Sequence, residues 1–342
     1  MKVASVAATI FGLVASVLAT PPRLGGVNTA GYDFTVSTDG YDTLPYAQPP
    51  LYQYPYFSLE GANLYRIPFA WQLATPTLGG PLNMTWLAEY DQNVQAALAT
   101  YAFVIVDVHN YARWNGEIIN QGGPTIEQYA SLWSQLAAYY KDEDRIIIGL
   151  MNEPHGTPYL PDNTLWPPAV QGAINAIRAA GATTQYILMP GSNYTSAAAM
   201  PTVMGPLLLN ITDPATPGST EFLLFDVHQY LDYDNSGTHT TCVTNNTEIL
   251  STLVTWLKAN GGRQAILSET GGGRNDSTCY TNLGEELAFV KDNYPYMVGF
   301  STWAAGAFDT TYILSMTPTN GNTDAPLWEY AVRPNLPAPT YT

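Results

Sequence analysis

The stretch IIIGLMNEPHG at residues 146–156 places three isoleucines, a leucine and a methionine directly before an Asn-Glu-Pro triplet. A continuous apolar run of this length is typical of a strand that is buried on both faces, as in a parallel sheet. The run leads to a carboxylate, Glu153, and Pro154 lacks the backbone N–H that a strand ladder needs. The pattern therefore predicts a buried parallel strand that presents Asn152 and Glu153 at its carboxyl end.

Similar apolar runs recur along the chain and alternate with helix-like stretches. The predicted strands are residues 25–28, 62–69, 103–110, 145–154, 185–193, 222–230, 264–270 and 297–306. Helix patterns lie between them; one begins at Thr125 and another ends at Gly181. Eight alternating units favour an α/β fold, a single (β/α)8 TIM barrel, over an open doubly wound sheet. No Gly-rich phosphate loop follows the first strand, which argues further against a nucleotide-binding sheet.

The composition limits the classes of partner. The 342 residues are 46% hydrophobic and 12% charged, which indicates a globular protein with a large core. The formal net charge of −16 argues against nucleic acid and anionic membranes, because both require clusters of Lys and Arg. A neutral or cationic substrate suits this surface better.

Residues 1–19 have the features of a signal peptide. A charged start at Lys2 precedes an apolar run that ends at a small residue, Ala19, and Pro21 soon follows. This run is too short for a membrane anchor. We therefore expect a secreted, extracellular monomer without membrane association after cleavage, with a single domain over residues 20–342.

Two further features fit an oxidising, secretory route. The chain has two cysteines, Cys242 and Cys279, which suits one disulfide. Five Asn-X-Ser/Thr sequons occur, at Asn83, Asn193, Asn210, Asn245 and Asn275. We expect glycosylation at Asn83, Asn210, Asn245 and Asn275, but not at Asn193, which lies at the carboxyl end of a predicted strand, where active sites of TIM barrels are found.

Polar and aromatic residues gather at the carboxyl ends of the predicted strands, where the active site of a TIM barrel lies. They are Arg66, His109, Asn110, Asn152, Glu153, His228, Tyr230, Glu269 and Trp303. Buried polar groups are costly unless they find partners, so we expect these side chains to converge on one cavity. Asp107, inside its strand, is expected to be a buried structural partner and not a third catalytic acid.

Glu153 and Glu269 indicate a specific reaction. Their strands are three apart, so the two carboxyl groups can face each other across the barrel mouth. Glycosidic cleavage needs one carboxyl to protonate the leaving oxygen and a second to attack the anomeric carbon or activate water. Arg66 would keep Glu269 ionised, whereas burial and the charge of Glu269 would keep Glu153 protonated.

Other chemistries are poorly supported. No His-X-X-X-His or clustered metal-ligand spacing occurs and the chain has only four histidines, so we predict no metal and no cofactor. No Gly-X-Ser-X-Gly motif marks a serine nucleophile. A non-catalytic carbohydrate-binding wall protein would have lost a catalytic carboxylate, and both are retained.

Seven segments, in this order, carry a resemblance to a known family. They are RIPFAWQL (66–73), VDVHNYARWNG (106–116), QGGPTIEQYASLWSQLA (121–137), GLMNEPHG (149–156), DVHQYLDYDNSGTHTTC (226–242), QAILSETGGG (264–273) and TWAAGAFDTTYILS (302–315). Together they resemble secreted fungal endo-β-1,4-glucanases of glycoside hydrolase family 5. The resemblance implies an enzyme that cuts β-1,4-glucan with retention; a β-mannanase or xyloglucanase of the same family is the alternative. Residues 20–342 would form one catalytic domain, and we expect no carbohydrate-binding module, because no Pro/Ser/Thr-rich linker occurs.

The resemblance also implies roles for individual residues. Glu153 matches the acid/base, Glu269 the nucleophile, and Asn152 the residue that binds the sugar 2-hydroxyl. The positioning and stacking residues that it implies are Arg66, His109, His228, Tyr230 and Trp303. It further implies a disulfide between Cys242 and Cys279 that joins the loops after strands six and seven.

Aromatic residues near the strand ends could stack on glucose rings. We expect such platforms at Tyr111 and Trp114, with Trp71 and Tyr194 as further candidates. The resemblance leads us to expect a Trp at the position of Tyr194. The tryptophans within helix patterns are instead expected in the core; they are Trp133, Trp166 and Trp256.

Overall fold

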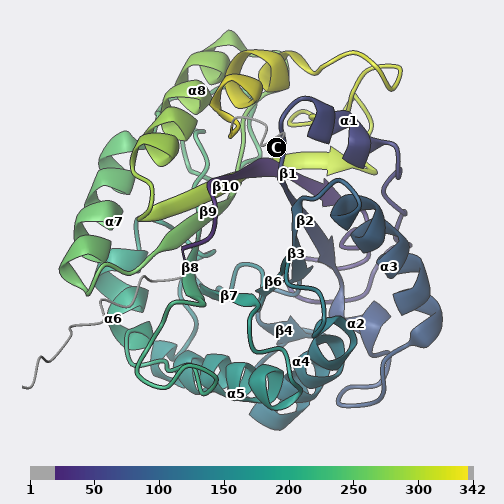
Figure 1. Cartoon of the computed structure of the whole chain (residues 1–342), viewed down its shortest axis with the longest axis vertical. Coiled ribbons are helices and arrows are strands. Elements are labelled where there is room, and N and C mark those ends of the chain that lie inside the picture. Colours follow the sequence, from purple (N-terminus) through teal and green to yellow (C-terminus); the bar gives the residue numbers. More distant parts are fainter. Residues whose placement is uncertain (1–19, 338–342) are drawn as a thin grey trace, which may run out of the picture.

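The computed structural model describes residues 20–337, and the predicted signal peptide, residues 1–19, lies outside the described residues. Eight parallel strands close into a barrel, and helices form a ring around it (Figure 1). The order around the barrel is β1-β10-β9-β8-β7-β6-β3-β2, so each strand pairs with its neighbour in the chain and β10 closes on β1. The prediction of a (β/α)8 barrel is confirmed.

The barrel strands are β1 (Leu24–Ala30), β2 (Leu64–Phe69), β3 (Phe103–Val108), β6 (Ile146–Gly149), β7 (Tyr186–Pro190), β8 (Leu223–His228), β9 (Ala265–Thr270) and β10 (Met297–Gly306). A small hairpin in the loop after β3 contains β4 (Arg113–Trp114) and β5 (Glu117–Ile118). The helices are α1 (Gln53–Leu59), α2 (Trp71–Ala74), α3 (Met84–Leu98), α4 (Ile126–Tyr140), α5 (Trp166–Ala179), α6 (Gly205–Leu208), α7 (Thr247–Ala259) and α8 (Ser277–Asp292). Short 3-10 or π turns form η1 (Asn163–Leu165), η2 (Met200–Met204), η3 (Trp328–Val332) and η4 (Arg333–Asn335).

Local sequence explains where the helices begin and end. The Thr125 hydroxyl accepts the Gln128 N–H at 3.2 Å, and the Gln128 side chain accepts the Thr125 N–H at 2.9 Å, so a capping box starts α4. Gly181 follows α5 with a φ of +99°, which a residue without Cβ adopts at low cost. Both predicted helix boundaries are confirmed.

Four predicted strands are too long at their carboxyl ends: those at 103–110, 145–154, 185–193 and 222–230 end at Val108, Gly149, Pro190 and His228. The difference is largest for the strand at 145–154. The prediction runs to Pro154, but β6 ends at Gly149. Glu153 has a φ of +44°, which no strand can accommodate, and Pro154 has no N–H to donate. Only Asn152 continues the pairing, through its N–H to the Val108 carbonyl at 2.7 Å.

The barrel interior changes from apolar to polar along the strands. One buried cluster includes Leu64, Ile105 and Ile147 from the lower part of three neighbouring strands. Because side chains alternate along a strand, the next inward positions are two residues further on, and on β2 and β3 these are Arg66 and Asp107. The apolar layer therefore supports a polar layer beneath the mouth.

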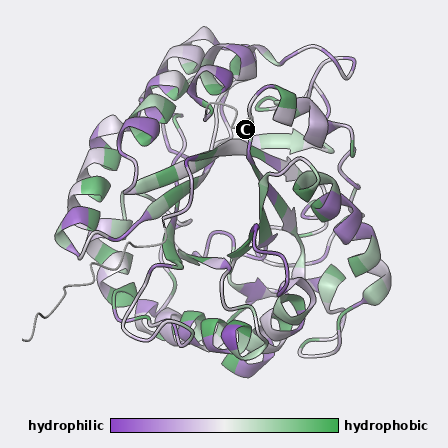
Figure 2. Cartoon of the chain, in the orientation of Figure 1, coloured by the Kyte–Doolittle hydropathy of each residue, from purple (hydrophilic) through white to green (hydrophobic). Residues whose placement is uncertain are grey.

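A second, larger apolar cluster fills the space between the strands and the helices. Figure 2 shows apolar residues along the barrel strands and a mixture of apolar and polar residues on the surrounding helices. This arrangement is typical of a parallel barrel covered by amphipathic helices. None of the described helices combines the length and the apolar composition that a bilayer-spanning segment requires.

Candidate active site

The predicted strand-end residues meet at the carboxyl end of the barrel, around the guanidinium of Arg66. This fully buried side chain donates to Glu269 Oε2 at 2.7 Å and to Asn152 Oδ1 at 2.7 Å. It also pairs with the buried Asp107 at 3.0 Å. A single cation thereby ties β2, β3, β9 and the segment after β6 together, and Asp107 is the structural partner that the sequence predicted.

Glu269 is held as a carboxylate. Its Oε1 accepts the Tyr230 hydroxyl at 2.8 Å, and its Oε2 lies 2.7 Å from Arg66 and 3.9 Å from His228 Nδ1. Burial acts to raise the pKa of Glu269, but the positive charges of His228 and Arg66 outweigh it and bring the pKa below its ordinary value.

Glu153 has the opposite tendency. Its Oε1 lies 2.8 Å from His228 Nδ1, and its side chain is only 15% exposed. Burial raises the pKa of Glu153, and the negative charge of Glu269 raises it further, against the opposing effect of the His228 contact. One oxygen of Glu153 and one of Glu269 lie within 4.8 Å of each other. The site therefore pairs a carboxyl that tends to stay protonated with one that tends to stay ionised.

His109 and Trp303 form one wall of the site. The His109 ring stacks on the Trp303 indole, with 5.4 Å between centroids and 14° between planes. His109 Nδ1 lies 2.9 Å from Asp107, and Trp303 donates its N–H to the Tyr312 hydroxyl at 3.1 Å. Both rings are thus fixed by contacts at their polar edges.

Asn152 carries an unused donor. Its Oδ1 accepts from Arg66, which orients the amide, but its Nδ2 is buried and has no hydrogen-bond partner within residues 20–337. An unpaired buried amide is costly, so a ligand acceptor at this position would gain a donor that is already oriented. Asn110, in contrast, uses its amide locally, on the Trp71 N–H, the Gln72 side chain and the Arg113 carbonyl.

The aromatic candidates divide into accessible and buried residues. Tyr111 is half-buried and contacts the edges of His109 and His155, both with centroids 5.5 Å apart. Tyr194 is 41% exposed and stacks on His155 at 4.0 Å. Tyr194 and His155 help line a groove of about 670 Å³ that also includes Arg113 and Tyr159. Tyr194 is therefore accessible to a ligand.

The prediction of Trp71 as a stacking platform is wrong, because this side chain is fully buried. It packs edge-on against Trp114, with centroids 5.3 Å apart, and so supports that half-buried ring from below. Trp133 and Trp166 lie in the core as predicted, and Trp256 is half-buried against it.

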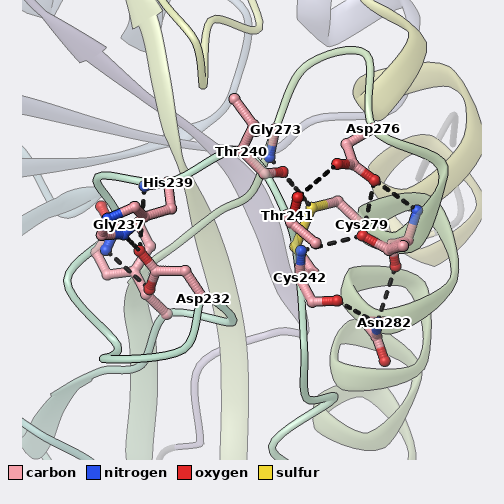
Figure 3. Close-up of a disulfide and its surroundings, with 12 residues drawn as sticks. Asp232, Gly237, His239, Thr240, Thr241, Cys242, Gly273, Asp276, Cys279 and Asn282 are labelled. Atoms are coloured by element: carbon pink, nitrogen blue, oxygen red, sulfur yellow. Dashed lines mark hydrogen bonds and ion pairs between the residues drawn. A yellow bond between two sulfur atoms is a disulfide. The ribbon is translucent and has the colours of Figure 1, made fainter.

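The predicted disulfide between Cys242 and Cys279 is confirmed (Figure 3). Cys242 lies in the loop after β8, whereas Cys279 lies in the first turn of α8 and not in the loop before it. Gly272 packs so close that an added Cβ would lie 2.5 Å from one sulfur. The bridge therefore locks the loop after β8 to the segment that directly follows Glu269.

Among the sequon asparagines, Asn193 directly precedes Tyr194, which lines the groove. Asn210 and Asn275 are exposed, whereas Asn83 and Asn245 are half-buried. The Asn83 oxygen caps α3 by accepting two backbone N–H bonds. Glycosylation at these four positions stays a prediction.

Sequence reasoning missed Asp226 and Ser268, two buried residues that extend the network below His228. A signal for Asp226 was available. The motif Asp-Val-His, followed by Asn or Gln and then Tyr, occurs at 107–111 and again at 226–230. Because side chains alternate along a strand, each motif directs an Asp and a His to the same face. Ser268 gave no such signal.

A TIM barrel with two close carboxyl groups at its mouth, one favoured as protonated and one as ionised, is the arrangement of retaining glycoside hydrolases. The model of the cellulase family, glycosyl hydrolase family 5, matches residues 54–306. The chain belongs to this family and is a glycoside hydrolase.

The names of similar proteins are consistent with this family. The chain is 59% identical to "Manganese dependent endoglucanase Eg5A" of Phanerodontia chrysosporium, over 97% of this chain and 86% of that protein. It is 45% identical to "Endoglucanase EG-II" of Hypocrea jecorina, over 87% and 73% of the two chains. The crystal structure of Cel5A (EG2) from Hypocrea jecorina superposes with a TM-score of 0.86 at 43% identity, covering 91% of this chain and 98% of that one.

Proposed function

We propose that this protein is a secreted, extracellular endo-β-1,4-glucanase that hydrolyses internal bonds of cellulose or mixed-linkage β-glucan with retention of configuration. The names of its relatives support the activity. The observation that carries the mechanism is the separation of at most 4.8 Å between oxygens of Glu153 and Glu269. Retaining enzymes place the two carboxyl groups roughly 5–5.5 Å apart, whereas inverting enzymes need roughly 6.5–9.5 Å to admit a water.

In the first step, ionised Glu269 attacks the anomeric carbon and forms a glycosyl ester. Glu153 gives its proton to the glycosidic oxygen, so the leaving chain departs as a neutral alcohol. Arg66 and Tyr230 each hold one oxygen of Glu269, which aims the nucleophile. This precise aim lowers the entropic part of the barrier.

In the second step, water hydrolyses the ester. Esterification removes the charge of Glu269, so the pKa of Glu153 falls and its carboxylate can accept a proton from water. The water oxygen bonds to the anomeric carbon and Glu269 leaves as a carboxylate. Glu153 regains its proton, and the site returns to its starting state.

The remaining residues are proposed to bind the sugar. The free Nδ2 of Asn152 supplies a donor for the 2-hydroxyl. Trp303, fixed against His109, supplies an apolar face beneath the ring. Tyr111 and Trp114 supply partly exposed aromatic faces further along the cleft.

Glu269→Gln tests the nucleophile. This substitution keeps the side-chain shape and removes the attacking charge, so we expect hydrolysis of carboxymethylcellulose to fall at least about 10⁴-fold with an unchanged circular dichroism spectrum. Glu248→Gln, the same change at an exposed position on α7, is the matched control and should retain full activity. Substantial activity in Glu269→Gln would refute the assignment.

A substrate panel tests the specificity and the stereochemistry. We expect barley glucan and carboxymethylcellulose to be cut faster than mannan or xyloglucan, with a rapid fall in solution viscosity that marks internal cleavage. Proton NMR should show the β-anomer as the first product. Preferential cleavage of mannan, or an initial α-anomer, would contradict the proposal.

The name of one relative mentions manganese, which raises the question of whether residues of this chain could bind a metal ion. In the described part of the chain, two groups have suitable donors, namely Glu153, His228 and Glu269, and Asp232, Asp234 and His239. The first is the catalytic pair itself. In the second, Asp232 already accepts three backbone N–H bonds from its own loop and lies 3.0 Å from the His239 ring (Figure 3).

These contacts satisfy the Asp232 carboxylate without a bound cation. We therefore propose that no metal takes part in hydrolysis. Chelation with EDTA, followed by added Mn²⁺, should change the rate less than about twofold. A strong activation by Mn²⁺ that His239→Ala removes would contradict this and assign the ion to the loop.

A further inference from the structure

A chain of hydrogen bonds runs from Glu153 down into the barrel. His228 contacts Glu153 through Nδ1 at 2.8 Å and the Ser268 hydroxyl through Nε2 at 3.0 Å. Ser268 in turn donates to Asp226 Oδ1 at 2.5 Å. His228, Ser268 and Asp226 are each at most 3% exposed, so the other end of the chain is closed to solvent.

An irregularity in the sheet lets Ser268 and the next residue, Glu269, both contact residues of the site. The register between β8 and β9 pairs Val227 with Leu267 and then His228 with Glu269, so Ser268 is the extra residue of a bulge. Consecutive strand residues normally point to opposite faces. The bulge lets Ser268 reach His228 from below while the next residue, Glu269, reaches Arg66 and Tyr230.

The proton positions follow from the donor inventory. A hydroxyl has one hydrogen, and a carboxylate can only accept. When Asp226 is ionised, as the neighbouring His228 and Arg66 favour against burial, Ser268 gives its hydrogen to Asp226 and must accept from Nε2–H of His228. With its proton on Nε2, neutral His228 has a free lone pair on Nδ1, which faces Glu153.

We propose that Asp226 and Ser268 are positioning residues that hold the proton of His228 on Nε2, so that Nδ1 and Glu153 share one exchangeable proton. This inference rests on the proposed function and extends it. Glu153 must give up a proton in the first step and take one back in the second, and a partner that accepts or donates without moving serves both steps.

The charges around His228 are consistent with this role. Glu153, Glu269 and Asp226 face it from the segment after β6, from β9 and from its own strand, and all favour the imidazolium form. Asp107 on β3 adds a more distant negative charge, and Arg66 on β2 is the opposing cation. Burial lowers the pKa of His228, but these carboxylates outweigh it and raise the pKa above its ordinary value.

The first Asp-Val-His motif provides an internal comparison. On β3, Asp107 contacts Nδ1 of His109 directly at 2.9 Å, and no side chain intervenes. On β8, Asp226 reaches the opposite nitrogen of His228, and only through Ser268. The two histidines therefore present different nitrogens to the cleft, and only His228 contacts the acid.

Nitrogen-15 NMR of the imidazole rings tests the tautomer directly. In the wild type, His228 should show a protonated Nε2 at every pH, with slow hydrogen exchange. In Ser268→Ala this N–H loses its acceptor, so its exchange should be at least about tenfold faster. A neutral His228 that carries its proton on Nδ1 in the wild type would overturn the proposal.

The pH profile of kcat/KM is the second readout. A bond from charged His228 to Ser268 is stronger than one from the neutral ring, so its loss should let the shared proton leave at lower pH. We expect the alkaline limb to move down by about 0.5–1 pH unit in Ser268→Ala and in Asp226→Asn. Ser268→Thr, which keeps the hydroxyl, should restore the wild-type limb.

Ser192→Ala removes another buried hydroxyl, one that donates to Asn163 at 2.7 Å, and is the matched control with an unmoved profile. An unmoved alkaline limb in folded Ser268→Ala, with glucan hydrolysis intact, would reject the positioning role and leave the proposed function standing. If the wild type hydrolysed no β-glucan, the function would fail, and the NMR measurement would still decide the tautomer.

Discussion

Glu153 and Glu269 are the same side chain in two different surroundings. Arg66 and the Tyr230 hydroxyl bind both oxygens of Glu269, whereas Glu153 faces a histidine and the charge of the other glutamate. A cation and a phenol stabilise an anion, and a neighbouring anion destabilises a second one. The division into nucleophile and acid is therefore set by the neighbours of each carboxyl.

Tyr230→Phe tests this division. The Tyr230 hydroxyl bonds the ionised form of Glu269 and helps to lower its pKa, so its removal should raise that pKa. Hydrolysis needs ionised Glu269, so the acidic limb of the kcat/KM profile should move to higher pH by about 0.5–1 unit, with kcat reduced about tenfold or more. Tyr139→Phe, at an exposed tyrosine on α4, is the control. An acidic limb that moves to lower pH would contradict the assignment.

Three residues around the cleft have strained backbone conformations. Glu153 has a φ of +44°, Tyr111 +54° and Tyr194 +55°, a region that residues with a Cβ rarely adopt. All three lie in segments that follow barrel strands. Strained residues of this kind persist where the surrounding structure holds them, and they are enriched at functional sites.

At the scale of elements, the disulfide joins the two segments that flank the nucleophile. Thr240 accepts the Gly273 N–H at 3.1 Å beside the bridge, and Gly237 packs on the Tyr230 ring. Replacing Cys242 and Cys279 by Ala frees a loop with a sequence separation of 37. We expect the free energy of unfolding to fall by about 2–4 kcal/mol, measured by urea denaturation. If the double variant unfolded at the wild-type urea concentration, the bridge would have no stabilising role.

A buried carboxyl, Glu286 on α8, connects the same elements. It accepts from Thr270 at 2.6 Å and from the Asn246 amide at 2.8 Å, and that amide also donates to the Tyr230 carbonyl. Burial raises the pKa of Glu286 to about 8, against hydrogen bonds that lower it. The side chain is therefore predominantly neutral in the folded protein below that pH.

This shift predicts an alkaline loss of stability. Because the folded pKa exceeds the unfolded one, the contribution of Glu286 is full below about pH 4.5, declines as the pH rises and is gone above about pH 8. The loss is on the order of 5 kcal/mol. Thermal unfolding of Glu286→Gln, which cannot ionise, should vary less between pH 5 and pH 9 than that of the wild type. Parallel curves for the two proteins would contradict the prediction.

At the scale of the whole molecule, periodic patterns predicted most of the fold. Eight apolar runs located the eight barrel strands, because burial on both faces leaves a continuous apolar signature. The same runs showed which residues follow each strand, although several strands end earlier than predicted. The residues that converge on Arg66 could therefore be named before their contacts were known. Topology brings these ends together even though Arg66 and Glu269 are far apart in the sequence.

The features that sequence could not predict depend on local departures from regular geometry. The bulge at Ser268 arises from the pairing of two distant strands, which a single strand's pattern does not encode. Trp71 has the same side chain as Trp114, and only the packing of the loop after β3 decides which one is exposed. Tertiary contacts, not propensities, determine both features.

The net charge of the whole chain predicts how salt affects its thermal stability. With 28 acidic and 12 basic residues, repulsion between exposed carboxylates outweighs exposed ion pairs such as that of Arg333 with Glu60 at neutral pH. Salt screens exposed charges but hardly affects buried pairs such as Arg178 with Asp213. At pH 7, raising NaCl from 20 to 300 mM should therefore increase Tm by about 1–3 °C. At pH 4.4, near the sequence pI, the same salt should have no effect, because the net charge is close to zero. Equal salt shifts at both pH values would show that charge repulsion does not limit the stability of this barrel.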